Sequence, residues 1–174
     1  GYINPATLED DQEDDQQQTA EINICRDLYQ LCRGESHLIF ANKRSNCEKF
    51  AAQLSHLCQQ NHVPNEFFPH HGSLAKELRE TLEARLQKEN LPTTAVCTMT
   101  LELGIDIGKI NAVAQVTPPQ TVASLRQRMG RSGRRGTSAI LRLFIEEEQL
   151  TAQSSIVDKL RLGLLQSVAM VRLL

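Results

Sequence analysis

The densest group of chemically capable side chains is the arginine segment Ser124–Gly136, SLRQRMGRSGRRG. A guanidinium group presents a planar fork of donors that stays charged at physiological pH and matches phosphate oxygens. Helical spacing places Gln127 and Arg131 on one face, and Arg134 follows three residues later. The interspersed glycines predict that the helix ends near Met129–Gly130, leaving the last arginines on a tight turn that faces outward. The segment therefore predicts an oxyanion clamp, most simply for phosphate.

An arginine cluster can also be a solvated surface or a general nucleic-acid patch. A second motif is therefore needed to decide between these interpretations and the phosphate clamp. The upstream segment CTMTLELGIDIGK supplies one. Thr98 offers a hydroxyl at a predicted strand end, Gly104 permits close backbone approach, and Asp106 places a carboxylate between two isoleucines. That carboxylate can accept hydrogen bonds from sugar hydroxyls or from an arginine, or it can simply cap backbone donors in a crossover.

The segment HHGSL, His70–Leu74, is typical of a strand followed by a glycine turn and a helix that Ser73 can cap. Free N–H groups at a helix N-terminus attract phosphate. The alternative is that Gly72 and Ser73 only shape the turn.

Apolar periodicity predicts the elements that position these segments. Strands are expected at residues 37–41, 66–70, 94–98, 110–116 and 139–145, and helices over 19–32, after 45, after 73 and from about 121. Short strands alternating with helices predict an α/β fold with a parallel sheet and helices on both faces. Because ligands bind beyond the carboxyl ends of such strands, we expect residues 71–73, 98–106 and 118 onward to converge on one edge.

Length and charge divide the chain into three parts. A chain of 174 residues suits one domain with appendages, and a mean hydropathy of -0.34 does not suit a membrane protein. Six of the 21 acidic residues lie in residues 1–20, so the remainder holds 15 acidic against 19 basic residues, a net charge of +4. We expect an acidic linker over residues 1–18, a lobe over 19–148 and a helical tail over 149–174 that leads to an absent accessory domain.

The five cysteines form no C-x-x-C pair and fall mostly at apolar positions. We interpret them as buried, reduced side chains of a cytoplasmic protein. Neither the cysteines nor the scattered histidines have spacings that favour a metal site or a thiol enzyme.

Four segments, LIFANKRS, HHGSL, VCTMTLELGIDIG and QRMGRSGRRG, occur in this order between about residues 35 and 145. Together they resemble the C-terminal RecA-like lobe of superfamily 2 DEAD/DEAH-type helicases, in the form of the Lhr-like branch. The resemblance implies a RecA-like parallel sheet of about five to six strands with helices on both faces.

The resemblance also implies roles for ten residues. Arg131 and Arg134 would be arginine fingers on the γ-phosphate of ATP, and Gln127 would lie at an interface between lobes. Gly104 and Asp106 would lie near the phosphates and ribose of the nucleotide. The nucleic-acid backbone, DNA or RNA, would be contacted by Asn42, Lys43, Gly72, Ser73 and Thr98.

The sequence contains no G-x-x-x-x-G-K-[ST] and no D-E-x-H or D-E-A-D segment. The resemblance therefore implies that ATP and Mg²⁺ are bound jointly with an N-terminal lobe of the same polypeptide. We expect this chain to be a piece of a longer helicase or translocase, inactive as an ATPase by itself and with no membrane partner. The alternative is a non-catalytic RecA-like module that binds nucleic acid or a protein.

Overall fold

A computed structural model of the chain describes residues 20–101, 107–133, 138–147, 150 and 154–174. Its sheet has five strands, all parallel, in the order β2-β3-β1-β4-β5. The strands are β1 (His37–Ala41), β2 (Phe67–His70), β3 (Thr94–Cys97), β4 (Ala112–Val116) and β5 (Leu141–Phe144). The predicted fold class is therefore confirmed, and each strand lies within or at the bounds expected from the sequence.

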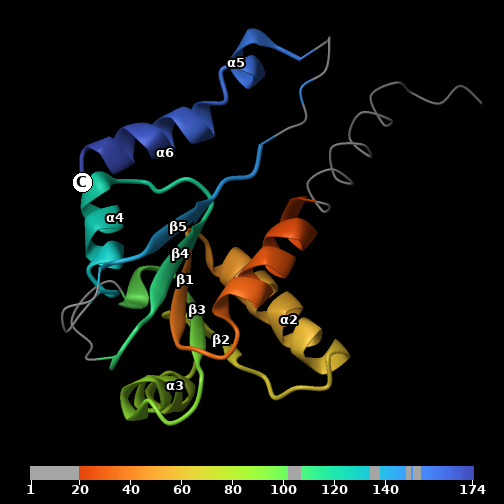
Figure 1. Cartoon of the computed structure of the whole chain (residues 1–174), viewed down its shortest axis with the longest axis vertical. Helices are drawn as coiled ribbons and strands as arrows, with labels where there is room; N and C mark the ends of the chain where they lie inside the picture. Colours follow the sequence, from red (N-terminus) through yellow and green to blue (C-terminus); the bar gives the residue numbers. More distant parts are fainter. Residues whose placement is uncertain (1–19, 102–106, 134–137, 148–149, 151–153) are drawn as a thin grey trace, which may run out of the picture.

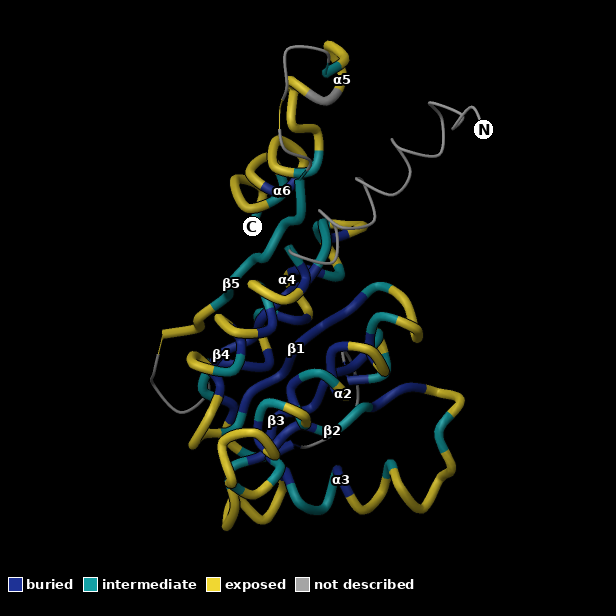
Figure 2. Tube along the Cα trace, turned by 90° about the vertical axis from the view of Figure 1, so that its right-hand side faces the viewer, coloured by how far each residue is buried: buried dark blue, intermediate teal, exposed yellow. Residues whose placement is uncertain are grey.

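The central strands are buried along their whole length. Every residue of β1, β3 and β4 is buried, which is typical of a parallel sheet covered on both faces. Alternate side chains of β1 point to opposite faces, so Ile39 packs into one hydrophobic cluster and Phe40 into the other. The chain therefore builds a three-layer α/β core, visible as the dark blue strands in Figure 2.

Helices cover both faces of the sheet (Figure 1). The helix of residues 20–32 and α2 (Arg44–Gln60) pack against the face that contains Ile39. On the other face lie α3 (Lys76–Lys88), anchored by Leu82 and Leu86, and α4 (Val122–Met129). A short 3₁₀ turn, η1 (Met99–Leu101), follows β3 and buries Leu101. The alternation predicted from the sequence thus places helices in both outer layers.

The C-terminal part contains α5 (Ile156–Lys159) and α6 (Leu162–Arg172), and α6 lies beside α4 (Figure 1). The side chain of Arg126 in α4 donates to the carbonyls of Leu173 and Leu174 at 3.1 and 3.0 Å. Gln166 Nε2 also donates to the Pro119 carbonyl at 3.3 Å. The predicted tail is therefore docked on the lobe, while much of its outer surface is exposed (Figure 2). No described helix has the length and apolar character to cross a bilayer.

All five cysteines are buried and unpaired with one another. Burial raises the pKa of the Cys25 and Cys32 thiols to about 12 and that of Cys47 to about 11. Because the thiolate is the reactive form, these thiols stay protonated and inert near neutral pH.

We therefore expect negligible reaction of the folded chain with a disulfide-exchange chromogen at pH 8. Five equivalents should react once the chain is unfolded in urea. Rapid release of one equivalent or more from the native chain would contradict the burial of these side chains.

Candidate functional site

At the carboxyl edge of the sheet, the connections that follow two neighbouring strands leave towards opposite faces. β1 and β4 are paired neighbours, but β1 leads into α2 on one face and β4 leads towards α4 on the other. In α/β sheets this divergence opens a crevice beyond the strand ends, which is where ligands bind. In this chain the residues at the divergence are Asn42 after β1 and Thr117 and Pro118 after β4.

The loops after the strands are joined to one another at this edge. Asn42 Nδ2 donates to the Pro118 carbonyl at 2.7 Å, which links the ends of β1 and β4. The Thr98 N–H donates to the His70 carbonyl at 3.3 Å, which links the ends of β3 and β2. The predicted convergence is therefore present for the described residues. Among the predicted nucleic-acid contacts, Lys43, Gly72 and Ser73 are exposed.

A buried polar network holds the loop that follows β2. The His70 ring is 1% exposed, with Nδ1 2.8 Å from Thr100 Oγ1 and Nε2 2.8 Å from Glu83 Oε1. Thr100 Oγ1 also lies 3.1 Å from the His70 carbonyl. One side chain thus ties β2, α3 and η1 together just before Gly72. The buried contacts of His70 therefore fix the position of the Gly72–Ser73 turn.

Ser73 does not cap α3, contrary to the sequence prediction. The helix begins at Lys76 with Ala75 at the N-cap, and no side chain caps it. The reason is a turn after His71, in which the Leu74 N–H donates to the His71 carbonyl at 3.1 Å and delays the start of the helix. The Ser73 hydroxyl is consequently free of a capping role and exposed at the carboxyl edge.

The helix α4 has the predicted start and end. Thr121 Oγ1 accepts from the Ser124 N–H at 3.1 Å, and Gly130 stands at the C-cap after Met129. Beyond it the chain continues in tight turns, with the Arg131 N–H donating to the Arg128 carbonyl at 3.0 Å. Thr121 caps the helix as an N-cap threonine is expected to.

The arginine segment differs from the outward-facing clamp that we expected. Gln127 is exposed, but Arg131 is only 8% exposed, because it lies past the end of the helix in a turn folded against the lobe. The other predicted nucleotide contacts, Gly104, Asp106 and Arg134, lie outside the described residues.

The turn after α4 is sterically fixed. Gly133 has a φ of +73°, and a Cβ added there would lie 2.4 Å from the Ala139 nitrogen. Only glycine avoids both the left-handed strain and this contact. The backbone of the turn after α4 is therefore packed tightly against Ala139, in the segment that leads into β5.

Two functional candidates were missed by sequence reasoning: Arg128 and Gln115. Arg128 is 4% exposed and its guanidinium lies 4.8 Å from the centroid of the Phe40 ring. It donates a hydrogen bond to Oε1 of Gln115, which is fully buried in β4. The available signals were a glutamine inside the apolar strand AVAQV and the i, i+3 spacing of Arg128 from the buried Leu125.

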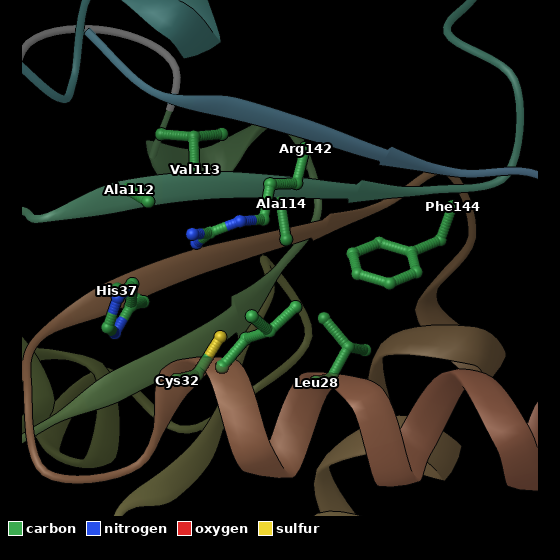
Figure 3. Close-up of a pocket in the computed structure, with 9 residues that line it drawn as sticks. Leu28, Cys32, His37, Ala112, Val113, Ala114, Arg142 and Phe144 are labelled. Carbon is green, nitrogen blue, oxygen red and sulfur yellow. The ribbon is translucent and has the colours of Figure 1, made fainter. Parts of the chain in front are cut away.

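A small hollow lies between the helix of residues 20–32 and strands β1, β4 and β5, and it is a gap in the packing, not a binding site (Figure 3). Its lining includes Leu28, Cys32, His37, Arg142 and Phe144, and it leaves no room for a water molecule. Burial lowers the pKa of His37 below its ordinary value, so this ring is neutral near pH 7. Within the described part of the chain, no cluster of three His, Cys, Asp or Glu side chains could hold a metal ion.

The fold and the carboxyl-edge site define an α/β lobe of the RecA-like class. Residues 20–136 match the family described as helicase conserved C-terminal domain, and the chain belongs to this family. It is similar to the ATP-dependent helicase Lhr-Core of Methanothermobacter thermautotrophicus, with 38% identity over 96 residues, 55% of this chain and 11% of that protein. It is also 34% identical over 133 residues, 61% of this chain and 9% of that protein, to the Lhr helicase/uracil glycosylase of Escherichia coli.

Among solved structures, the chain is similar to the Mycobacterium smegmatis helicase Lhr bound to ssDNA and AMP-PNP. The TM-score is 0.72 with 28% identity, covering 86% of this chain and 18% of that one. The matched segment thus spans roughly a tenth of the curated relatives' length and under a fifth of the solved helicase.

Proposed function

We propose that this chain is the second motor lobe of an ATP-dependent nucleic-acid helicase or translocase of the Lhr type. The observation that carries the proposal is the family match over residues 20–136, combined with the gathering of the described motif residues at one carboxyl edge. The relative solved with ssDNA and AMP-PNP supports a DNA track and a bound nucleotide.

In this proposal the lobe contributes charge and position, and the other lobe contributes the phosphate loop. Arg131 and Arg134 meet the γ-phosphate of ATP, Gln127 lies at the interface between the lobes, and Gly104 and Asp106 border the nucleotide. Mg²⁺ supplies charge neutralisation at the phosphates when bound. Its ligands are assigned to the N-terminal lobe, as the resemblance to this helicase family implies.

The burial of Arg131 sets a condition on this mechanism. Its side chain is held within the lobe, 8% exposed, before any second lobe closes. The triphosphate has to approach the remaining exposed edge of Arg131, or the turn has to shift when the cleft closes. A guanidinium that is already ordered loses less side-chain entropy on binding phosphate than a freely rotating one.

The nucleic-acid track is proposed to run over the ends of β1, β2 and β3. Lys43 provides charge, Asn42 and Thr98 provide polar groups, and the Gly72–Ser73 turn provides exposed backbone. Contacts of this kind bind the phosphate backbone and do not read the base sequence. We therefore expect affinity that falls with salt and depends little on base sequence.

The test is ATP hydrolysis by the full-length protein with and without single-stranded DNA or RNA. The motor proposal expects turnover that rises when the strand is added, and a phosphate loop and a D-E-x-H-like segment elsewhere in the same protein. Retained strand binding without any ATP hydrolysis would overturn it. That result would instead support the non-catalytic nucleic-acid module.

Gly72 gives a test of the nucleic-acid surface that does not disturb the fold. A Cβ added at Gly72 meets nothing within 4 Å, and the backbone there is not left-handed. Gly72→Ala should therefore leave the melting temperature nearly unchanged. If the strand approaches this backbone closely, affinity should fall about 3- to 10-fold, the equivalent of about one hydrogen bond.

The measurement is fluorescence anisotropy with a labelled oligonucleotide, beside a thermal melt. Gly34→Ala is the matched control, because it also has open space but has a φ of +86°. It should cost about 1 kcal/mol of stability from backbone strain and leave affinity intact. An unchanged affinity for Gly72→Ala would remove the turn from the proposed track.

A further inference from the structure

A directional chain of hydrogen-bonded side chains, buried at two members and half-buried at the third, joins the carboxyl ends of β1 and β4. It consists of Arg128 in α4, Gln115 in β4 and Asn42 after β1, and we refer to these three residues as the crevice relay. Arg128 is 4% exposed and Gln115 is fully buried. Buried polar groups in an otherwise apolar sheet are costly unless they are satisfied, so this cluster needs an explanation.

The direction of every hydrogen bond in the relay follows from chemistry. Arginine can only donate, so the Gln115 oxygen must face Arg128 and its amide nitrogen must face away. That nitrogen donates to Asn42 Oδ1 at 3.3 Å and also lies near the carbonyls of Val116 and Thr117. Asn42 must then direct its own nitrogen to the Pro118 carbonyl, 2.7 Å away. Neither amide can flip without losing a partner.

The two ends of the relay lie at the two proposed ligand contacts. At one end, the Arg128 carbonyl accepts from the backbone N–H of Arg131, the proposed phosphate contact. At the other end, Asn42 is itself a proposed nucleic-acid contact and precedes the exposed Lys43. Between them, Gln115 also holds Thr117, a β-branched residue with a φ of +74°. Such a conformation persists only where its surroundings hold it.

We propose that Arg128 and Gln115 are positioning residues that couple the arginine turn to the nucleic-acid contact at Asn42. The inference rests on the proposed function. When the turn that carries Arg131 shifts on nucleotide binding, Arg128 moves with it, and the buried bond to Gln115 transmits the shift to Asn42. Burial makes this transmission effective, because water cannot replace a broken bond inside the sheet.

The experiment uses the full-length protein and measures the oligonucleotide Kd with and without a non-hydrolysable ATP analogue. The ratio of the two values is the coupling factor, and allosteric coupling factors are typically about 5- to 150-fold. Gln115→Met preserves volume but removes both polar contacts. It should bring the coupling factor to within about threefold of one, and because this factor is a ratio, a change in the Kd without nucleotide does not affect the comparison.

Combining Gln115→Met with Asn42→Ala separates coupling from general destabilisation. If the relay acts through Asn42, Gln115→Met has no further effect on the coupling factor in the Asn42→Ala background. A structural role gives independent, additive effects. Leu28→Ala is the stability control, since Leu28 is fully buried on the opposite face of the sheet and should lower the melting temperature without altering coupling.

Gln115→Glu provides a second variant if Gln115→Met does not fold. It keeps an acceptor for Arg128 but cannot donate to the backbone carbonyls, so a reduced coupling factor is again expected. The relay proposal is overturned if the wild type shows coupling and the Gln115 variants retain it. If the wild type shows no effect of the ATP analogue on oligonucleotide affinity, the proposed motor function fails and the relay proposal fails with it.

Discussion

Replacing Arg131 and Arg134 together by alanine is expected to lower kcat for ATP hydrolysis by about 10³-fold or more in the full-length protein. The reason is that an arginine finger stabilises charge on the γ-phosphate that is larger in the transition state than in bound ATP. Binding of ATP should weaken much less than turnover. The measurement is steady-state ATPase activity with saturating nucleic acid.

Arg126→Ala is the matched control for this variant. Arg126 lies on α4, shortly before the arginine turn, and is exposed, and its guanidinium donates to the carbonyls of Leu173 and Leu174. Its loss should leave turnover within about twofold, since surface contacts contribute little. Unchanged turnover in the double variant would remove the assignment of both arginines.

The burial of Arg131 requires a check that the double variant folds. Arg131→Lys keeps the positive charge but loses the planar fork, so it should retain stability better than alanine while turnover still falls. A melting temperature near the wild-type value with a large loss of kcat would identify a catalytic defect. Parallel loss of both would identify a structural residue.

Phe40→Ala is expected to destabilise the folded chain by about 3–5 kcal/mol, the largest stability effect we predict for a single site. Phe40 is fully buried in β1, on the face of the sheet that contains α3 and Arg128. Truncation leaves a cavity in the central strand and removes the ring that lies 4.8 Å from the Arg128 guanidinium. The free energy of unfolding can be measured by urea denaturation.

Phe40→Leu separates the loss of buried volume from the loss of the aromatic ring beside Arg128. Leucine keeps much of the apolar volume but presents no aromatic face, so a cost of about 1–2 kcal/mol is expected, in addition to the lost cation–π interaction. In an Arg128→Met background, the cost of Phe40→Leu should be smaller by that interaction, about 1–2 kcal/mol because both groups are buried. A cost below about 1.5 kcal/mol for Phe40→Ala itself would show that the site collapses or is less well packed than described.

Much of the fold could be predicted because strand and helix signals are local. The run HLIFA forms β1 over the predicted residues, and the cap at Thr121 and the stop near Gly130 bound α4 as expected. The start of α3 was predicted less accurately, because a turn after His71 places it at Lys76. Local patterns do not report how long a turn is when a buried histidine network fixes it.

For the candidate site, the sequence predicted which segments meet but not how their side chains are oriented. Parallel β-strands place their carboxyl ends at one edge, so the meeting of the loops after β2, β3 and β4 followed from alternation alone. The orientation of individual side chains did not follow. Arg131 is buried, where an outward guanidinium was expected, since the helix ends before it and the turn folds back.

The sequence by itself determined the fold class, the family and the edge of the sheet where ligands are expected, because these depend on periodicity and on residues close together in the chain. Only the tertiary structure decided which polar side chains are joined. Gln115 is separated from Asn42 by 73 positions and from Arg128 by 13. Their contact depends on the pairing of β1 with β4 and on the face that α4 covers, and neither is encoded in any local stretch of residues.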